Sequence, residues 1–348
     1  MVGLSGGSSV LHSIAASRLG LRRRPSFCTF IVSWRCNARC VMCDIWRKKS
    51  SSEMDLGQIS SVFSKLGRLD ALRLTGGEPF LRPDIGQIID AADSIIRPGM
   101  VHITSNGLLT SKIVDTVKSL KRTDNLHVKI SLDYPDQRHD RLRGIEGAFD
   151  RAHSTLKELS RLREKLGFYL GIDQTIVNPD QLTDGMRTLC DGLGVGLHQV
   201  LAYDFCPLYG ADGGNITEAY NRYGKKEAAA IIGKMRSAHR IPDFKERMVK
   251  RYYLSGLENR ILKGVSKPNP ECAALGAHIR ILPDGDVPVC LYHPAIVGNL
   301  LRQGLDEIWF GKEIQTQRKV VRECPGCWAG CEVIPSAIYC GDIFRAII

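Results

Sequence analysis

Between residues 27 and 240 the chain repeats one pattern six times: a short run of β-branched or aromatic residues, then a longer stretch of helical periodicity. Consecutive β-then-α units favour a parallel sheet joined by right-handed crossovers. At roughly 30 residues a unit, the stretch holds six units and not the eight of a closed barrel. The expected strands are 27–33, 71–75, 100–105, 126–133, 168–177 and 196–203. The expected helices are 56–66, 85–96, 111–120, 148–165, 181–193 and 225–238.

Small and polar residues follow each expected strand, where the carboxyl ends of a parallel sheet gather functional groups. Gly, Asn and Asp form turns after any strand, so their presence alone is weak evidence for a site. Three cysteines within eight residues have no such explanation. The residues at these ends are Cys36, Cys40, Cys43, Gly76, Gly77, Glu78, Pro79, Asn106, Gly107, Asp133, Asn178 and Asp204.

The net charge of +11 is concentrated at one end of the chain. Six arginines and no acidic residue precede Asp44, so the first 43 residues carry +6 of it. This marks residues 1–26 as a basic N-terminal segment with one short amphipathic helix, and it argues against a broad nucleic-acid-binding face. An organellar transit peptide is an alternative for that segment. The sequence contains no apolar run of 18 residues, so no transmembrane segment is expected.

After residue 240 the repeat ends. A helix is expected over 244–262, followed by a hairpin whose two arms, 279–281 and 287–289, flank the turn sequence PDGD. A cysteine-dense tail comes next. The expected domains are therefore the six-unit core at 27–240 and a second unit at 241–348. The 12 cysteines are grouped at ligand-like spacings in a large chain, which favours reduced thiolates that bind metal in the cytoplasm over disulfides.

The first cysteine group has the spacing Cys36-x3-Cys40-x2-Cys43. Three thiolates from one loop can hold three corners of a four-iron four-sulfur cluster and leave one iron open to a small molecule. A zinc site is the alternative, but it needs a fourth ligand. Asp44 is a poor candidate, and no histidine lies between His12 and His102.

This cysteine loop, the sequence Gly76-Gly77-Glu78-Pro79 after the second strand and the six α/β units together resemble the radical S-adenosylmethionine (SAM) superfamily. The resemblance covers about 27–240 and implies a partial (β/α)6 TIM-type barrel. It also implies that SAM chelates the open iron. The reduced cluster then cleaves SAM to methionine and a 5′-deoxyadenosyl radical, which abstracts a hydrogen atom from the substrate.

Matching the family's motifs residue by residue implies a SAM-binding set. Glu78 would accept from the SAM amino group, and Gly76 and Gly77 would let the backbone approach it. Arg143 would pair with the SAM carboxylate, with Arg141 as its competitor. Met42 replaces the aromatic residue that the family usually has before the third cysteine. The implied set is Gly76, Gly77, Glu78, Pro79, Ser105, Asn106, Ser131, Asp133 and Arg143.

A second cysteine group lies in the tail and resembles the SPASM and shorter twitch extensions that hold auxiliary clusters in part of this superfamily. Two fully liganded clusters need eight thiolates and the tail has six, so one auxiliary 4Fe–4S cluster is expected. Cys340 would then be a spare thiol, and a structural zinc remains an alternative. The expected ligands are drawn from Cys272, Cys290, Cys324, Cys327 and Cys331.

These features predict a radical SAM enzyme that acts on a small-molecule or sugar-like substrate, with oxidation of that substrate through the auxiliary cluster. A reductant such as flavodoxin or ferredoxin would be its partner. The short segment before the first strand has no room for a leader-binding domain, so ribosomal-peptide maturation is the alternative substrate class. A non-enzymatic two-cluster electron carrier is the alternative of another class, and it would need neither an open iron nor the GGEP sequence.

Overall fold

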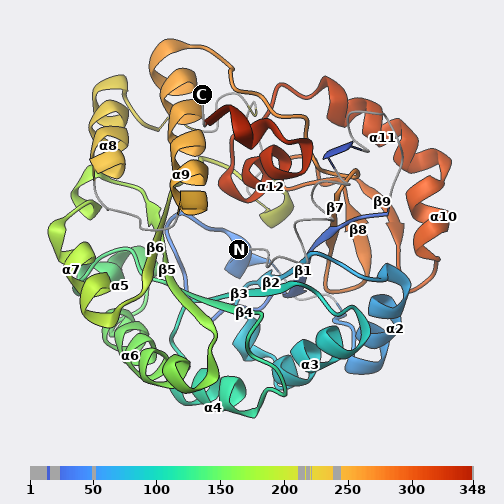
Figure 1. Cartoon of the computed structure of the whole chain (residues 1–348), viewed down its shortest axis with the longest axis horizontal. Helices are drawn as coiled ribbons and strands as arrows, with labels where there is room; N and C mark the ends of the chain where they lie inside the picture. Colours follow the sequence, from blue (N-terminus) through green and yellow to red (C-terminus); the bar gives the residue numbers. More distant parts are fainter. Residues whose placement is uncertain are drawn as a thin grey trace.

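The computed structural model describes residues 14–15, 24–48, 52–210, 216, 220, 222–237 and 244–346. Within them, seven strands form one curved sheet in the order β6-β5-β4-β3-β2-β1-β7, and every neighbouring pair is parallel. Helices surround the outside of the sheet (Figure 1). The strands are β1 Phe27–Ser33, β2 Ala71–Gly76, β3 Met100–Ser105, β4 Leu126–Ser131, β5 Tyr169–Ile176, β6 Gly196–Leu201 and β7 His278–Ile281.

Each of the six predicted β-then-α units is present, and the ends of the predicted strands differ from the observed ones by at most two residues. The partial (β/α)6 barrel is therefore confirmed. The predicted N-terminal helix lies mostly outside the described residues. The helices are α2 Leu56–Leu66, α3 Ile85–Ile95, α4 Thr110–Ser119, α5 Arg138–Arg143, α6 Ala148–Leu166, α7 Asp184–Leu193, α8 Lys225–Ser237, α9 Phe244–Leu257, α10 Leu305–Phe310, α11 Lys312–Glu323 and α12 Gly330–Cys340.

The prediction that the two segments flanking PDGD pair with each other as a hairpin is wrong. Its first arm is β7, which joins the main sheet as a seventh strand beside β1. Its second arm, β8 (Asp286–Pro288), instead pairs antiparallel with β9 (Ile296–Asn299). A seventh parallel strand thus comes from the cysteine-rich part of the chain. The domain limit at residue 240 stays a prediction, because the sheet and the C-terminal part share β7.

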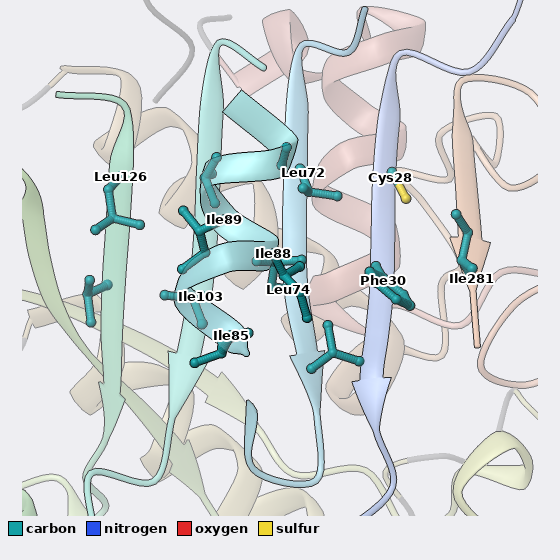
Figure 2. Close-up of a cluster of buried hydrophobic side chains, with 14 of the residues drawn as sticks. Cys28, Phe30, Leu72, Leu74, Ile85, Ile88, Ile89, Ile103, Leu126 and Ile281 are labelled. Carbon is teal, nitrogen blue, oxygen red and sulfur yellow. The ribbon is translucent and has the colours of Figure 1, made fainter. Parts of the chain in front are cut away.

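The convex face of the sheet packs against the helices through one large hydrophobic core. Alternate residues of the strands point into it, and α3 contributes Ile85, Ile88 and Ile89 (Figure 2). The alternation is visible in β4, where fully buried residues alternate with half-buried ones. The half-buried residues line the concave face, so that face keeps some contact with solvent.

Helix α12 lies across the gap between the two edge strands. A side chain at Gly330 would lie 3.2 Å from Val200 of β6, and Glu332 pairs with Arg280 of β7. At the other end of the helix, Tyr339 packs near the amino ends of β1 and β2. The C-terminal helix therefore closes the side of the barrel that the six units leave open. Among the described residues, none of the helices combines the length and apolar character needed to cross a membrane.

Replacing Ile88 by alanine tests the core. Ile88 has no exposed surface, so Ile88→Ala should lower the free energy of unfolding by about 2–5 kcal/mol. Val320→Ala on α11 is the control, because Val320 is 43% exposed and a surface change of this kind should cost under about 0.5 kcal/mol. Urea unfolding followed by circular dichroism measures both. Equal losses in the two variants would contradict the assignment of this core.

Candidate active site

The loop after β1 presents Cys36, Cys40 and Cys43 from one short stretch of chain. All three thiols are free and half-buried. The Ala38 N–H donates to Cys36 Sγ at 3.5 Å, and the Cys43 N–H donates to the Cys40 carbonyl at 3.2 Å. These bonds fold the loop back on itself and keep the three thiols in one region.

One side of the cysteine loop is bonded to the segment that follows β2. The Gly77 N–H donates to the Ser33 carbonyl and the Glu78 N–H donates to the Arg35 carbonyl, each at 2.8 Å. A Cβ at Gly76 would lie 2.3 Å from the Ser33 oxygen, and one at Gly77 would lie 2.1 Å from the Arg35 oxygen. We expected these glycines to admit SAM. The neighbours that require glycine here are backbone atoms of the cysteine loop.

The other side of the cysteine loop is bonded to the end of α5. The Arg39 N–H donates to the Arg143 carbonyl and the Val41 N–H donates to the Leu142 carbonyl, each at 2.9 Å. Gly144 ends this helix with a φ of +63°, and a Cβ there would lie 2.7 Å from the Arg39 oxygen. Backbone bonds on both sides therefore hold the loop, independently of its side chains.

Glu78 is buried directly beside this loop, with 1% of its surface exposed. Its carboxylate accepts from the Phe80 N–H at 3.0 Å, the Ser105 hydroxyl at 2.9 Å and the Asn106 N–H at 2.7 Å. Pro79 starts the one-turn helix that brings the Phe80 N–H into place. Burial raises the pKa of Glu78 to about 7 despite these donors. Ser105 and Asn106, both predicted as site residues, thus act on Glu78 in the structure.

Arg143 lies between Asp133, a predicted site residue, and Cys40 of the cysteine loop. Its Nη2 lies 2.8 Å from Asp133 Oδ2, and its Nη1 donates to Cys40 Sγ at 3.6 Å. The other oxygen of Asp133 accepts from the Thr175 N–H at 3.0 Å. Burial alone would lower the pKa of Arg143, but Asp133 and Cys40 outweigh it and raise that pKa. Ser131 is the half-buried last residue of β4, two residues before Asp133.

The residues present fit an iron–sulfur cluster with a small zwitterion beside it. Burial raises the pKa of Cys36 to about 11 and that of Cys43 to about 12. Positive iron would supply the charge that buried thiolates need. Among the described residues, the buried Nε of Arg143 has no hydrogen-bond acceptor. Glu78 carries acceptor oxygens and Arg143 carries a spare donor, which is the pair that an amino acid moiety requires.

Cys272 interacts electrostatically with three other tail cysteines, Cys290, Cys324 and Cys327. Burial first, and then Glu332 and Cys324, raise the pKa of Cys272 to about 11. Burial, Glu332 and Cys272 raise the pKa of Cys290 to about 12. The pKa of Cys327 is raised in the same way, with Cys272 and then Cys331 among its neighbours. Cys272 is therefore the common neighbour of a group of four thiols.

Cys331 and Cys340 have other surroundings. Cys331 packs in the hydrophobic cluster that also contacts Cys36 and Cys43 of the first loop. Cys340, at the end of α12, has Asp342 and Glu271 as its charged neighbours. Cys331 thus lies toward the first cysteine loop, and Cys340 is separate from the group of four.

No three His, Cys, Asp or Glu side chains of the described part of the chain gather around one point as the ligands of a single metal ion would. A cubic cluster is larger than one ion and holds its thiolates farther apart.

Three side chains at or after β5 and β6 are candidate bases for removing a proton from the substrate: Tyr169, Tyr203 and Asp204. Asp204 accepts from both the backbone and the side chain of Arg222, so it is already paired. The Tyr169 hydroxyl lies 2.6 Å from His198 Nε2 on the concave face. Burial raises the pKa of Tyr203 well above its usual value, which makes it a weak acid at neutral pH.

Comparison with known proteins identifies the chain. The radical SAM superfamily model matches residues 30–182, and the iron–sulfur cluster-binding domain named SPASM matches residues 272–331. The chain belongs to the radical SAM superfamily and carries a C-terminal SPASM domain. It is an enzyme that binds SAM and a 4Fe–4S cluster, with auxiliary iron–sulfur binding in the SPASM domain. The electron-carrier alternative is thereby excluded.

Among curated relatives, the AdoMet-dependent heme synthase of Methanosarcina barkeri is 27% identical over 87% of this chain and 88% of its own length. The GTP 3′,8-cyclase of Aquifex aeolicus is 26% identical over 82% of this chain and 87% of the relative. The sporulation killing factor maturation protein SkfB of Bacillus subtilis is 30% identical, but the match spans only 38% of that protein.

Among solved structures, SuiB of Streptococcus suis bound to S-adenosylmethionine has a TM-score of 0.59 at 14% identity, covering 90% of this chain and 72% of SuiB. The enzyme anSMEcpe with bound AdoMet and a peptide also has a TM-score of 0.59, at 17% identity, covering 85% of this chain and 83% of its own. At such identities the likeness establishes the fold alone.

The iron content of cysteine variants tests which cysteines bind the auxiliary cluster. The reconstituted protein should hold about eight iron atoms per chain, for two clusters. Cys272→Ala or Cys290→Ala should reduce this to about four, because each removes a ligand of the auxiliary cluster. Cys340→Ala is the matched control and should keep the full content. Full iron in Cys272→Ala, or zinc in place of iron, would contradict the assignment.

Proposed function

We propose that this radical SAM enzyme abstracts a hydrogen atom from a small-molecule or sugar-like substrate and completes an oxidation through the auxiliary cluster. The observation that carries the first half is the meeting of the three-cysteine loop with Glu78 and Arg143. Two elements far apart in sequence, the end of β2 and the end of α5, are bonded to opposite sides of that loop. Iron ligands and groups for an amino acid moiety are thus adjacent.

In this proposal Cys36, Cys40 and Cys43 hold the cluster. The cluster that these cysteines would hold, once reduced by flavodoxin or ferredoxin, would supply the electron for cleavage of SAM to methionine and the 5′-deoxyadenosyl radical. Glu78 accepts a hydrogen bond from the SAM amino group, and Arg143 donates its spare Nε–H to the SAM carboxylate. Ser131 and Asp133, at the end of β4, face the ribose side of the same molecule.

The auxiliary site supports an oxidation because a cluster bound by four cysteines has no open iron to chelate SAM but can accept an electron. Cys272, Cys290, Cys324 and Cys327 are the proposed ligands, since Cys272 interacts with each of the other three. A substrate that has lost a hydrogen atom would pass one electron to this cluster and one proton to a base. The product would then be two electrons more oxidised than the substrate.

The small-molecule class is favoured by two relatives. The heme synthase and the GTP cyclase, whose names specify small-molecule chemistry, match this chain over most of their own length. A peptide is the alternative substrate, because two neighbours in fold, SuiB and anSMEcpe, are known in complex with peptides. Deuterium transfer from labelled candidate substrates into 5′-deoxyadenosine distinguishes the two classes.

Anaerobic, reduced enzyme should release 5′-deoxyadenosine from SAM, as measured by chromatography. Cys36→Ala should abolish the release, because the loop then keeps only two iron ligands. Cys190→Ala is the control: Cys190 is a buried thiol on α7, remote from the loop in sequence, and this variant should retain the activity. Persistent cleavage in Cys36→Ala would refute the proposal. Cys272→Ala should cleave SAM and yet lose the product.

The affinity for SAM should depend on pH through Glu78. Its pKa in the folded protein is about 7. Above this pH the carboxylate is ionised and can accept from the SAM amino group, and below it the carboxyl is protonated. Between pH 8 and pH 6 the affinity should fall roughly tenfold, as measured by equilibrium dialysis of radiolabelled SAM. Glu78→Gln should bind SAM weakly at both pH values. If this variant shows the same tenfold fall between pH 8 and pH 6 as the wild type, the role of Glu78 is contradicted.

A further inference from the structure

We propose that the concave face of the sheet carries an anion-binding site, centred on Arg73, for a carboxylate or phosphate group of the substrate. This inference rests on the proposed function, because it names the substrate class of the same enzyme. The site is one row of neighbouring residues across four strands: Arg280 on β7, Thr29 on β1, Arg73 on β2 and His102 on β3. We call it the arginine row.

The register places these four residues side by side. Thr29 pairs with Arg73 on one side and with Arg280 on the other, and Arg73 pairs with His102. The two arginines are therefore only two strands apart, about 10 Å between backbones. Longer-range electrostatics agree, because the charge of Arg280 acts on Arg73. Two guanidinium groups at this spacing can converge on one oxyanion.

Arg73 is the cation of this face that lacks a carboxylate of its own. Lys129 lies 3.0 Å from Asp173, and Arg280 donates to Glu332 at 2.7 Å. Arg73 instead donates to a neutral oxygen, the Cys331 carbonyl, at 3.3 Å. No ion pair between described residues includes it. Arg73 is half-buried, and its guanidinium also lies over the Phe27 ring, 5.0 Å from the ring centroid. The concave face therefore carries one positive charge that no ion pair neutralises.

Two further donors of the row lack partners among the described residues. The Nε of Arg280 and the Nε2 of His102 are both buried without a hydrogen bond. Burial, together with Lys129 and Arg73, lowers the pKa of His102 far below its usual value, so its ring is neutral. A neutral imidazole can still donate one N–H to an oxyanion. Free donors and surplus positive charge thus occur at the same level of the sheet.

The row lies below the level of the cysteine loop. Thr29 is four residues from Ser33, the end of β1, which corresponds to about 13 Å along the strand. An anionic group bound at the row would be the end of the substrate remote from the reacting carbon. The enzyme would hold an elongated substrate by its charged end and expose its other end to the radical.

The test measures anion binding by the reconstituted full-length enzyme under anaerobic conditions. Inorganic phosphate and acetate are the probes, titrated at constant ionic strength and followed by NMR line width. Binding of phosphate over acetate indicates a phosphate group, and the reverse a carboxylate. Arg73→Gln should weaken binding about tenfold or more, and Arg73→Lys should restore part of it, because lysine keeps the charge but loses the planar fork.

Arg122→Gln is the matched control, since Arg122 is an exposed arginine paired with Asp124 at 2.7 Å, and it should bind the probes like the wild type. If neither probe binds, or if Arg73→Gln and Arg122→Gln bind equally, the proposal is overturned. If the Arg73→Gln protein loses its iron, His102→Leu is compared with the wild type instead. It removes the free nitrogen and should weaken binding about threefold, and unchanged binding there also overturns the proposal.

The two proposals fail separately. Release of 5′-deoxyadenosine without substrate tests the radical SAM assignment, and Arg122→Gln should leave that release intact. If the wild type binds phosphate but never cleaves SAM, the proposed function fails and the anion site stands. If SAM is cleaved but no anion binds, the anion site fails and the proposed function stands.

Discussion

The buried ion pair between Glu332 of α12 and Arg280 of β7 connects the two halves of the molecule. Both side chains are almost fully buried, and His278 Nδ1 lies 3.5 Å from the same carboxylate. Burial would raise the pKa of Glu332, but Arg280 and His278 outweigh it and lower that pKa well below the usual range. Removing either partner of such a pair leaves an isolated buried charge, which typically costs about 3–5 kcal/mol. The SPASM cysteines are thereby tied to the sheet.

The two faces of that sheet differ in polarity. The convex face is apolar and fully covered by helices, so it supplies most of the folding free energy. The concave face is polar and half-buried, and it carries arginine, lysine, histidine and aspartate side chains. Such groups are costly to keep in a protein interior. Most of them are paired within the protein, as Lys129 is with Asp173 and Arg280 is with Glu332.

Much of this arrangement follows from the sequence, because it depends on local periodicity and spacing. The cysteine loop was recognisable from three residues, and Glu78 from its GGEP context. The extended segment of the seventh strand was predicted, but its place in the sheet was not. His278–Ile281 is four residues long, and a local pattern indicates that a segment is extended without naming its partner. Glu332 was missed for a related reason: a glutamate side chain is normally solvent-exposed, and only the fold shows that this one meets Arg280.

The pairing of β1 with β7 also has a consequence for how the chain is made. Phe27 pairs with His278, so one edge of β1 stays unpaired until a segment about 250 residues further along the chain has been made. During synthesis the nascent barrel would expose an unpaired, apolar strand edge, which is a template for aggregation. Folding of the catalytic domain therefore finishes only when the SPASM segment emerges from the ribosome. A chain truncated before residue 278 is expected to be insoluble, although it holds every residue of the SAM site.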